Sequence, residues 1–132
     1  MFNCITAEDI AILKEMTAPE RVLAAGQISE DYSHDELGGV TRMPDVLLKA
    51  ASTEEIAAVM GYLNGRRIRV VVRGSGTGLV GAGVALHGGV MIETLGMNQI
   101  LELDEENLTI TVQPGVLLME LAAFCEERGF LY

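Results

Sequence analysis

The sequence predicts an α+β fold, in which a small parallel βαβ unit is followed by the start of a mainly antiparallel unit. Two observations lead to this prediction. Between residues 46 and 72 an apolar run, a capped amphipathic helix and a second apolar run follow one another. After a glycine-rich loop the apolar runs become short, β-rich and closely spaced, as in antiparallel sheets. We expect one domain over residues 1–132, with the first unit over about 1–88 and the second from about 89.

The first part of the chain carries two helix-start signals. Thr6 precedes two acidic residues and an apolar face made by Ile10 and Leu13, which predicts a capped helix. Pro19 repeats the signal and predicts a second, short helix around residues 21–24.

The segment over residues 26–42 is polar and weakly patterned. Ser33, His34 and Asp35 are adjacent there, but the members of a catalytic triad meet through the fold and not as chain neighbours. We therefore interpret this segment as a solvated loop.

The βαβ unit begins with an apolar strand over residues 46–48. Ser52 and Glu55 form a capping-box pattern at the start of the next helix, which ends at Asn64 and Gly65. Its apolar face comprises Ile56, Val59, Met60 and Leu63. Residues 68–72 alternate too little for a half-exposed strand, so we expect a parallel strand that is covered on both faces.

The stretch RGSGTGLVG follows this strand directly. Glycine lets backbone N–H groups approach an anion closely, so we interpret the loop as a diphosphate cradle at the carboxyl end of a parallel strand. Four of the nine cationic residues lie within the eight residues that lead into it, which favours a small anionic ligand. The alternative is a tight turn flanked by solvated arginines. The candidate binding residues are Arg73, Gly74, Ser75, Gly76, Thr77, Gly78, Leu79, Val80 and Gly81.

The same glycines invite two other interpretations. Gly76, Gly78 and Gly81 spell GxGxxG, and Glu93 lies where the acid of a nicotinamide site would bind ribose. Only seven residues separate Gly81 from Gly89, too few for the crossover helix that such a site needs. A Walker loop is excluded because no lysine follows Lys49.

After the loop, we expect an antiparallel meander of residues 89–94, 100–103 and 108–112, with a turn over residues 104–107. A helix should follow Pro114 and end at Gly129. Its inward residues would be Val116, Leu117, Leu118, Leu121, Ala122 and Cys125. The last three residues are apolar and would begin a further structural element that the sequence does not complete. We therefore expect a longer parent chain.

Composition limits the partners. The net charge of −10 and the pI near 4.5 argue against nucleic acid as the main partner. The start of the chain is acidic where a signal peptide would be basic, and no stretch reads as a membrane span, so we expect a cytoplasmic protein. Cys4 and Cys125 have no metal-ligand spacing, and we interpret His87 as a loop residue.

From about Tyr32 onward the chain resembles the N-terminal part of the FAD-linked oxidases of the vanillyl-alcohol oxidase, or PCMH, type. It is most similar to the flavin subunits of glycolate oxidase and D-lactate dehydrogenase. The motifs that carry the resemblance are YSHDE, PDVLL, STEEI, VVVRGSGTGLVGAGVALHGGVMIE, LGMNQILELDEENLTITVQPGV and the final GFLY. The resemblance implies a PCMH-like FAD-binding fold, of which this chain would hold the first subdomain and the start of the second.

The resemblance also implies a cofactor and a reaction. The amides of residues 73–81 would hold the FAD pyrophosphate, with hydroxyl donors from Ser75 and Thr77 and with Leu79 and Val80 near the flavin. Thr77 stands where some relatives carry a histidine that binds FAD covalently, so we expect non-covalent FAD. The parent enzyme would oxidise a small 2-hydroxy acid to the 2-oxo acid. Electrons would pass to a quinone, an electron-transfer flavoprotein or an iron–sulfur subunit.

The substrate-binding residues of that family would lie beyond Tyr132, so we expect this chain alone to be inactive. An open alternative is a non-enzymatic domain that binds a phosphate ligand or a protein partner and whose glycine loop is structural. The sheet edge near residues 108–112 would be uncovered, which makes a homo-oligomer possible.

Overall fold

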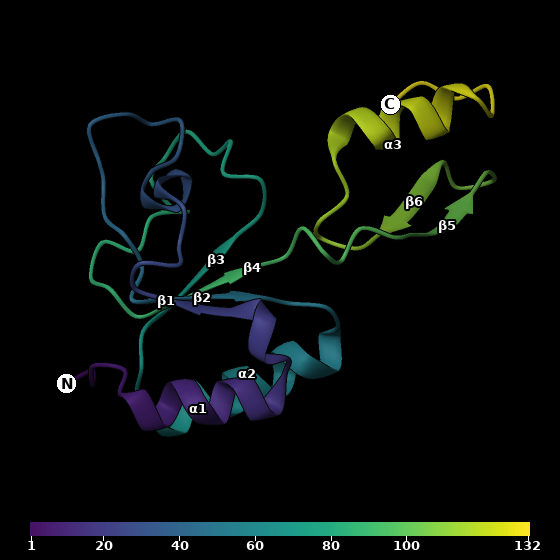
Figure 1. The fold of residues 1–132 in the computed structure, drawn as a ribbon. Helices are drawn as coiled ribbons and strands as arrows, with labels where there is room; N and C mark the ends of the chain where they lie inside the picture. Colours follow the sequence, from purple (N-terminus) through teal and green to yellow (C-terminus); the bar gives the residue numbers. More distant parts are fainter.

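The computed structural model describes residues 1–132 and shows two units (Figure 1). The first is a four-stranded sheet with two helices on one face and long loops on the other, and the second is a hairpin with one helix. This arrangement confirms the predicted α+β class. The elements are α1 (Ala7–Met16), η1 (Pro19–Arg21), β1 (Val22–Ala24), η2 (Glu30–Ser33), β2 (Val46–Lys49), α2 (Thr53–Gly65), β3 (Val70–Arg73), β4 (Val90–Glu93), β5 (Ile100–Asp104), β6 (Thr109–Val112) and α3 (Leu118–Glu126).

The larger sheet has the strand order β1-β2-β4-β3. β4 lies between β2 and β3 and is parallel to both, while β1 is antiparallel to β2. The predicted strands over residues 46–48 and 68–72 are confirmed. The prediction that residues 89–94 open the antiparallel meander is wrong, because the all-apolar run of β4 fills the central place in the parallel sheet. The division between the two sheets therefore lies after Glu93.

β3 is the edge strand of this sheet. Its neighbour β4 is buried along its whole length, whereas Val72 of β3 is 58% exposed. The prediction that both faces of residues 68–72 are covered is therefore wrong. A uniformly apolar strand indicates a parallel sheet, but it does not reveal which strand becomes the edge.

Side-chain caps mark the starts of α1 and α2. Thr6 and Asp9 form a complete capping box at α1. Ser52 caps α2 by accepting the Glu55 N–H at 3.1 Å, but the carboxylate of Glu55 binds Arg21 at 2.7 Å instead of returning to the cap. The predicted short helix is only a single 3-10 turn over Pro19–Arg21, and residues 22–24 form β1, which pairs with β2.

The core has two layers, one on each face of the sheet. The larger lies between the sheet and the helices α1 and α2, and a smaller one on the loop side contains Leu47, Ala85 and Met91. Alternation along β2 explains the division, because Val46 and Leu48 face the helices while Leu47 faces the loops. Both faces of the central strands β2 and β4 are thus buried, and the edge strand β3, which leads into the glycine loop, pairs with β4.

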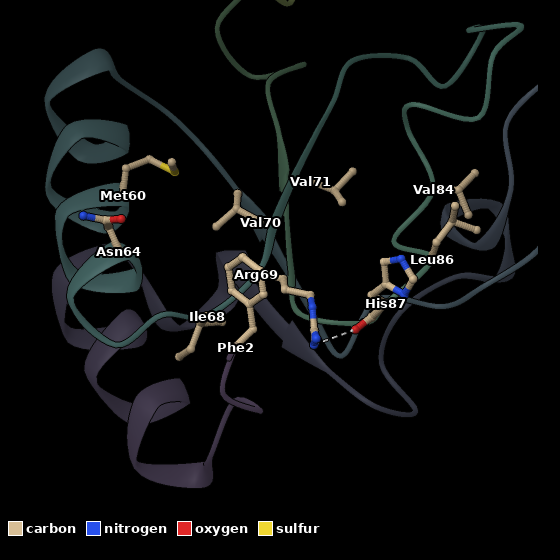
Figure 2. Close-up of a pocket in the computed structure, with 11 residues that line it drawn as sticks. Phe2, Met60, Asn64, Ile68, Arg69, Val70, Val71, Val84, Leu86 and His87 are labelled. Carbon is tan, nitrogen blue, oxygen red and sulfur yellow. Dashed lines mark hydrogen bonds between the residues drawn. The ribbon is translucent and has the colours of Figure 1, made fainter.

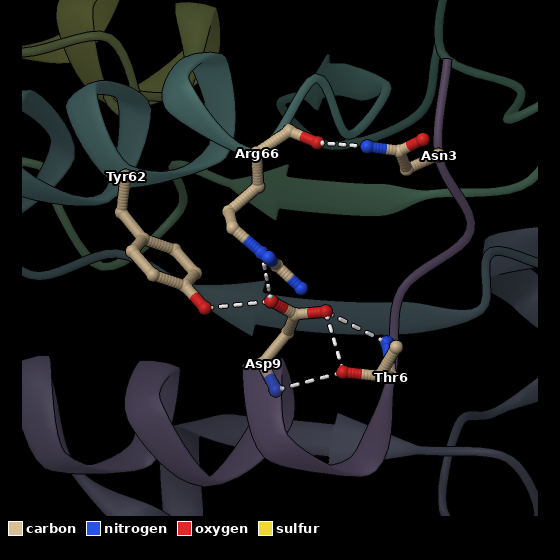
Figure 3. A network of polar contacts seen from close by, with 5 residues as sticks. All are labelled: Asn3, Thr6, Asp9, Tyr62 and Arg66. Carbon is tan, nitrogen blue, oxygen red and sulfur yellow. Dashed lines mark hydrogen bonds and ion pairs between the residues drawn. The ribbon is translucent and has the colours of Figure 1, made fainter.

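A buried carboxylate ties α1 to α2 (Figure 3). Asp9 Oδ1 accepts hydrogen bonds from the Tyr62 hydroxyl at 2.6 Å and from Arg66 Nε at 2.9 Å, and Oδ2 accepts from Thr6. Burial alone would raise the pKa of Asp9, but these hydrogen bonds outweigh it and hold the pKa well below its usual range. The carboxylate therefore stabilises the fold in its charged form.

Asp9→Asn should lower the free energy of unfolding by about 2 kcal/mol at pH 7, because it removes a charged hydrogen-bond acceptor. A folded-state pKa below the unfolded value of about 3.9 means that the carboxylate stabilises the fold above that pH and loses this effect as the pH falls. Urea denaturation of both proteins at pH 7 and pH 3 measures this. The difference between them should shrink at pH 3, and an unchanged difference would assign the effect to packing.

The second unit extends from the end of β4, away from α1 and α2 (Figure 1). Asp104 accepts the N–H groups of Glu106 and Asn107 in the turn between β5 and β6, which confirms the predicted turn. Leu121 and Cys125 of α3 are buried as predicted, but Leu117, which precedes the helix, and Leu118 are 40% and 66% exposed and do not point inward. None of the helices combines the length and apolarity that spanning a lipid bilayer requires.

Candidate functional site

The loop after β3 exposes a run of unused hydrogen-bond donors. None of the backbone N–H groups of residues 74–83 donates a hydrogen bond within the chain. Unpaired N–H groups need water or a ligand, and successive N–H groups in a glycine-rich turn form a concave site for anions. The loop leaves the carboxyl end of a parallel strand, where ligands of open α/β sheets bind.

Two glycines give the loop its shape. Gly76 has φ +83° and Gly81 has φ +74°, a backbone region that other residues rarely adopt. A Cβ on Gly76 would overlap the guanidinium of Arg73, whereas a Cβ on Gly74 would meet no atom within 4 Å. Gly76 therefore packs against Arg73 at the base of the loop, and a side chain there would disturb Arg73 rather than fill the cradle from above.

Arg73 holds the loop onto the segment before β2. Its side chain donates to the backbone carbonyls of His34 at 2.6 Å, Asp31 at 2.9 Å and Gly83 at 3.3 Å, and it stacks over the ring of Tyr32. Only 7% of Arg73 is exposed. The guanidinium is thus occupied within the chain, and Arg73 positions the loop rather than offering a free charge to a phosphate.

Tyr32 and Glu93 form a second link beneath the loop. The Tyr32 hydroxyl donates to the carboxylate of Glu93, which is buried at the end of β4. Burial and this hydrogen bond raise the pKa of Tyr32 to about 12, so the phenol remains a donor at neutral pH. Glu93 therefore has a partner within the chain.

Most of the segment over residues 26–42 is exposed, as the prediction of a solvated loop requires, but two residues within it are buried. Ser33 and Asp35 are nearly inaccessible, and Arg42 N–H donates to the Ser33 carbonyl at 2.7 Å. Ser33 Oγ lies 3.1 Å from His34 Nδ1, but Asp35 contacts neither of these side chains. Long-range hydrogen bonds from Arg73 hold the backbone at Asp31 and His34, and no local pattern reveals such bonds.

The loop side chains suit a ligand with polar and apolar parts. Ser75 Oγ and Thr77 Oγ1 lie 3.2 Å apart on the exposed side of the loop. Leu79 and Val80 are 69% and 78% exposed. Exposed neighbouring aliphatic side chains beside unpaired amides fit a ligand that joins a phosphate to an apolar ring.

The nicotinamide interpretation is excluded by the local structure. Residues 82–88 form turns and bends and no helix, so no helix N-terminus faces the loop. The GxGxxG match therefore does not form a dinucleotide-binding βαβ unit of the Rossmann type.

The largest groove lies elsewhere, along the open edge of β3 (Figure 2). It has a volume of about 500 Å³, and apolar side chains such as Phe2, Met60 and Leu86 line most of it. Arg69 stacks over Phe2 and donates to the His87 carbonyl at 3.3 Å, so its charge is partly satisfied. The exposed His87 has no side-chain hydrogen bond, consistent with a loop residue. The lining is mostly apolar, and its N–H donors are the separate side chains of Asn64, Arg69 and His87 rather than a run of free backbone amides.

Known proteins match both the sequence and the fold. The family described as FAD binding domain matches residues 44–132. The chain is 47% identical to D-lactate dehydrogenase of Anaerostipes hadrus over 133 residues, which cover 99% of the chain and 28% of that enzyme. It is 41% identical to glycolate oxidase subunit GlcD of Bacillus subtilis over 101 residues, which cover 76% of the chain and 22% of that protein.

The fold is that of p-cresol methylhydroxylase, solved with substrate bound. The TM-score is 0.82 with 19% identity, over 98% of this chain and 27% of that one. The chain thus spans about a quarter of the length of the curated relatives that it matches. Because the family match covers more than half of the chain and includes the glycine loop, the chain belongs to the FAD binding domain family.

Proposed function

We propose that residues 73–81 bind the pyrophosphate of FAD. The observation that carries the proposal is the run of backbone N–H groups over residues 74–83 that have no partner within the chain. Gly74, Gly76, Gly78 and Gly81 leave these groups open to a diphosphate, and Ser75 and Thr77 add hydroxyl donors. Leu79 and Val80 would contact the flavin, and Arg73 holds the loop in place.

We infer that the parent enzyme oxidises a 2-hydroxy acid to a 2-oxo acid. The names of the two relatives, D-lactate dehydrogenase and a glycolate oxidase subunit, support this substrate class. FAD would supply the redox chemistry, while this chain binds and orients it. An electron-transfer flavoprotein, an iron–sulfur subunit or a quinone would accept the electrons. The chain itself offers half of a cofactor site, so we propose that it does not catalyse the reaction alone.

Gly74→Val tests the cradle. A Cβ at Gly74 meets no atom within 4 Å and Gly74 has no left-handed φ, so the fold should be kept while bulk is added beside the free amides. We expect at least a tenfold loss of FAD affinity, measured by quenching of flavin fluorescence, with an unchanged thermal melt. Gly61→Val is the matched control, because its Cβ also meets open space but lies on α2, across the sheet from the loop (Figure 1). Equal affinity of both variants would contradict the proposal.

We propose that FAD is held without a covalent bond, since Thr77 offers no nitrogen nucleophile within the loop. Acid precipitation of the FAD-loaded protein should leave the yellow colour in the supernatant. A yellow pellet that resists washing would contradict this.

We also propose that the chain self-associates. The β5–β6 hairpin has unpaired strands on both sides, and Leu101 and Leu108 are exposed. Sedimentation velocity should show a weight-average mass that rises with protein concentration. Leu108→Lys should reduce this rise by adding charge in the turn beside the edge of β6, and a constant monomer mass for the unmodified chain would contradict the proposal.

A further inference from the structure

The glycine loop covers a buried carboxylate oxygen that has no partner. Asp35 is 4% exposed, and its Oδ1 accepts the Leu37 N–H at 3.2 Å. Its Oδ2 is buried and accepts no hydrogen bond from any group of the chain. Leaving such an acceptor unsatisfied costs about 1–3 kcal/mol. A hydrogen-bond donor from outside the chain would therefore stabilise this oxygen.

The carboxylate is held in place from two sides. Arg73 fixes the His34 carbonyl immediately before it, and the Glu36 N–H immediately after it donates to the Gly78 carbonyl at 3.0 Å. The unpaired oxygen faces the loop, because a Cβ built on Gly78 would lie 3.7 Å from Oδ2 and one on Gly83 would lie 4.0 Å from it. Asp35 therefore lies directly beneath the second half of the loop, near Gly78 within the proposed phosphate site and Gly83 just after it.

The charge of Asp35 determines which group it can receive. A phosphate oxygen would be repelled by a carboxylate, and the guanidinium of Arg73 is bonded to backbone carbonyls rather than to Asp35. The carboxylate needs a hydroxyl or N–H donor, whereas the neighbouring amides need an acceptor. The two requirements together describe a ligand that carries hydroxyl groups a few bonds away from its phosphate.

We propose that Asp35 Oδ2 accepts a hydrogen bond from a sugar or sugar-alcohol hydroxyl of the ligand whose phosphate binds the loop. This inference rests on the proposed function, and it assigns Asp35 the recognition of the hydroxyl-bearing part. A ribose hydroxyl and a ribityl hydroxyl have the same chemistry, and both lie close to the pyrophosphate in FAD. To reach Oδ2, the hydroxyl must displace residues near Gly78 and Gly83. Their N–H groups are unpaired, but their carbonyls must give up the hydrogen bonds from the Glu36 N–H and from Arg73.

The test is a comparison of ligands across two variants. Asp35→Asn keeps the size of the side chain and removes its charge, while Glu36→Gln makes the same charge change on an exposed neighbour whose side chain bonds to nothing. Isothermal titration of each full chain uses pyrophosphate, ADP and FMN. Two further ligands lack the hydroxyls. The analogue 2′,3′-dideoxy-ADP is compared with ADP to test the ribose, and a flavin with a phosphorylated butyl chain is compared with FMN to test the ribityl chain.

We expect Asp35→Asn to weaken the binding of ADP or FMN by about tenfold, as for a lost hydrogen bond to a charged group. Pyrophosphate should bind this variant as tightly as the unmodified chain or more tightly. The hydroxyl-free analogue of the affected ligand should bind the unmodified chain about tenfold more weakly and should be insensitive to Asp35→Asn. Glu36→Gln should not discriminate between ligands. Weaker binding of ADP to Asp35→Asn would identify the ribose as the group that Asp35 binds, and weaker binding of FMN would identify the ribityl chain.

Two results would overturn the inference. An equal change for pyrophosphate and for the hydroxyl-bearing ligands would assign Asp35 to folding or to bulk charge. Equal binding of ligands with and without hydroxyls to the unmodified chain would do the same, and that measurement needs no variant. If the Asp35 inference alone fails, pyrophosphate binding still responds to Gly74→Val, whereas no binding of any ligand overturns the proposed function as well.

Discussion

Arg73→Met is expected to lower the free energy of unfolding by about 3 kcal/mol and to abolish binding of FAD. The variant removes a buried cation and leaves the carbonyls of Asp31, His34 and Gly83 without their donors. Each hydrogen bond from a charged donor is worth about 1.5–3 kcal/mol, and the three are not additive because one side chain makes them all. Loss of the stacking on Tyr32 adds to the effect.

Arg42→Met is the control, because Arg42 is exposed and its side chain makes no hydrogen bond. It changes the net charge equally and should leave the urea midpoint within error. Arg73→Lys should fall between the two, since one ammonium cannot match the fork that reaches three carbonyls. If Arg73→Met melts like the unmodified chain, the guanidinium does not hold the loop in place.

The same contacts show what the sequence could and could not predict. The βαβ unit, the turn at Asp104 and the glycine loop follow from local signals, namely caps, apolar periodicity and glycine spacing, and all three are present. The strand order cannot be predicted from local sequence signals. The apolar composition of residues 90–92 is the same as that of residues 70–72. Only the strands with which they pair make β4 central and β3 the edge.

The site shows the same division. The sequence indicated which residues form the loop, because glycine density after a parallel strand has a direct physical meaning. It did not indicate that the Arg73 guanidinium donates hydrogen bonds to backbone carbonyls some forty residues earlier in the chain. It also did not indicate that Asp35 is buried beneath the loop. Those facts depend on a polar segment that is mostly exposed, as its composition predicted, and that composition does not distinguish the buried Ser33 and Asp35 from their exposed neighbours.

The role of Arg73 also changes how the loop must be probed by mutation. Gly76→Val appears from the sequence alone to be the natural way to block the cradle, since a new Cβ should point at the phosphate. In the structure that Cβ overlaps the Arg73 guanidinium, and Gly76 has φ +83°. A loss of binding in this variant would therefore report a disturbed loop and not a filled site.

We expect Gly76→Val to lower the free energy of unfolding by about 2–3 kcal/mol, in contrast to Gly74→Val. Strain from a positive φ accounts for about 1–3 kcal/mol, and the displaced guanidinium loses part of its hydrogen bonding. Urea denaturation of the single variants and of the double variant with Arg73→Met measures the coupling between the two sites.

In the Arg73→Met background the clash with the guanidinium is gone and only the backbone strain remains. Gly76→Val should then cost at least 1 kcal/mol less than in the unmodified chain, which is within the usual range for residues in contact. Additive effects would mean that Gly76 is required for its backbone conformation alone. A large coupling would show that Arg73 and Gly76 act as one unit that sets the position of the free amides, and it would explain why the loop needs both residues before any phosphate can bind.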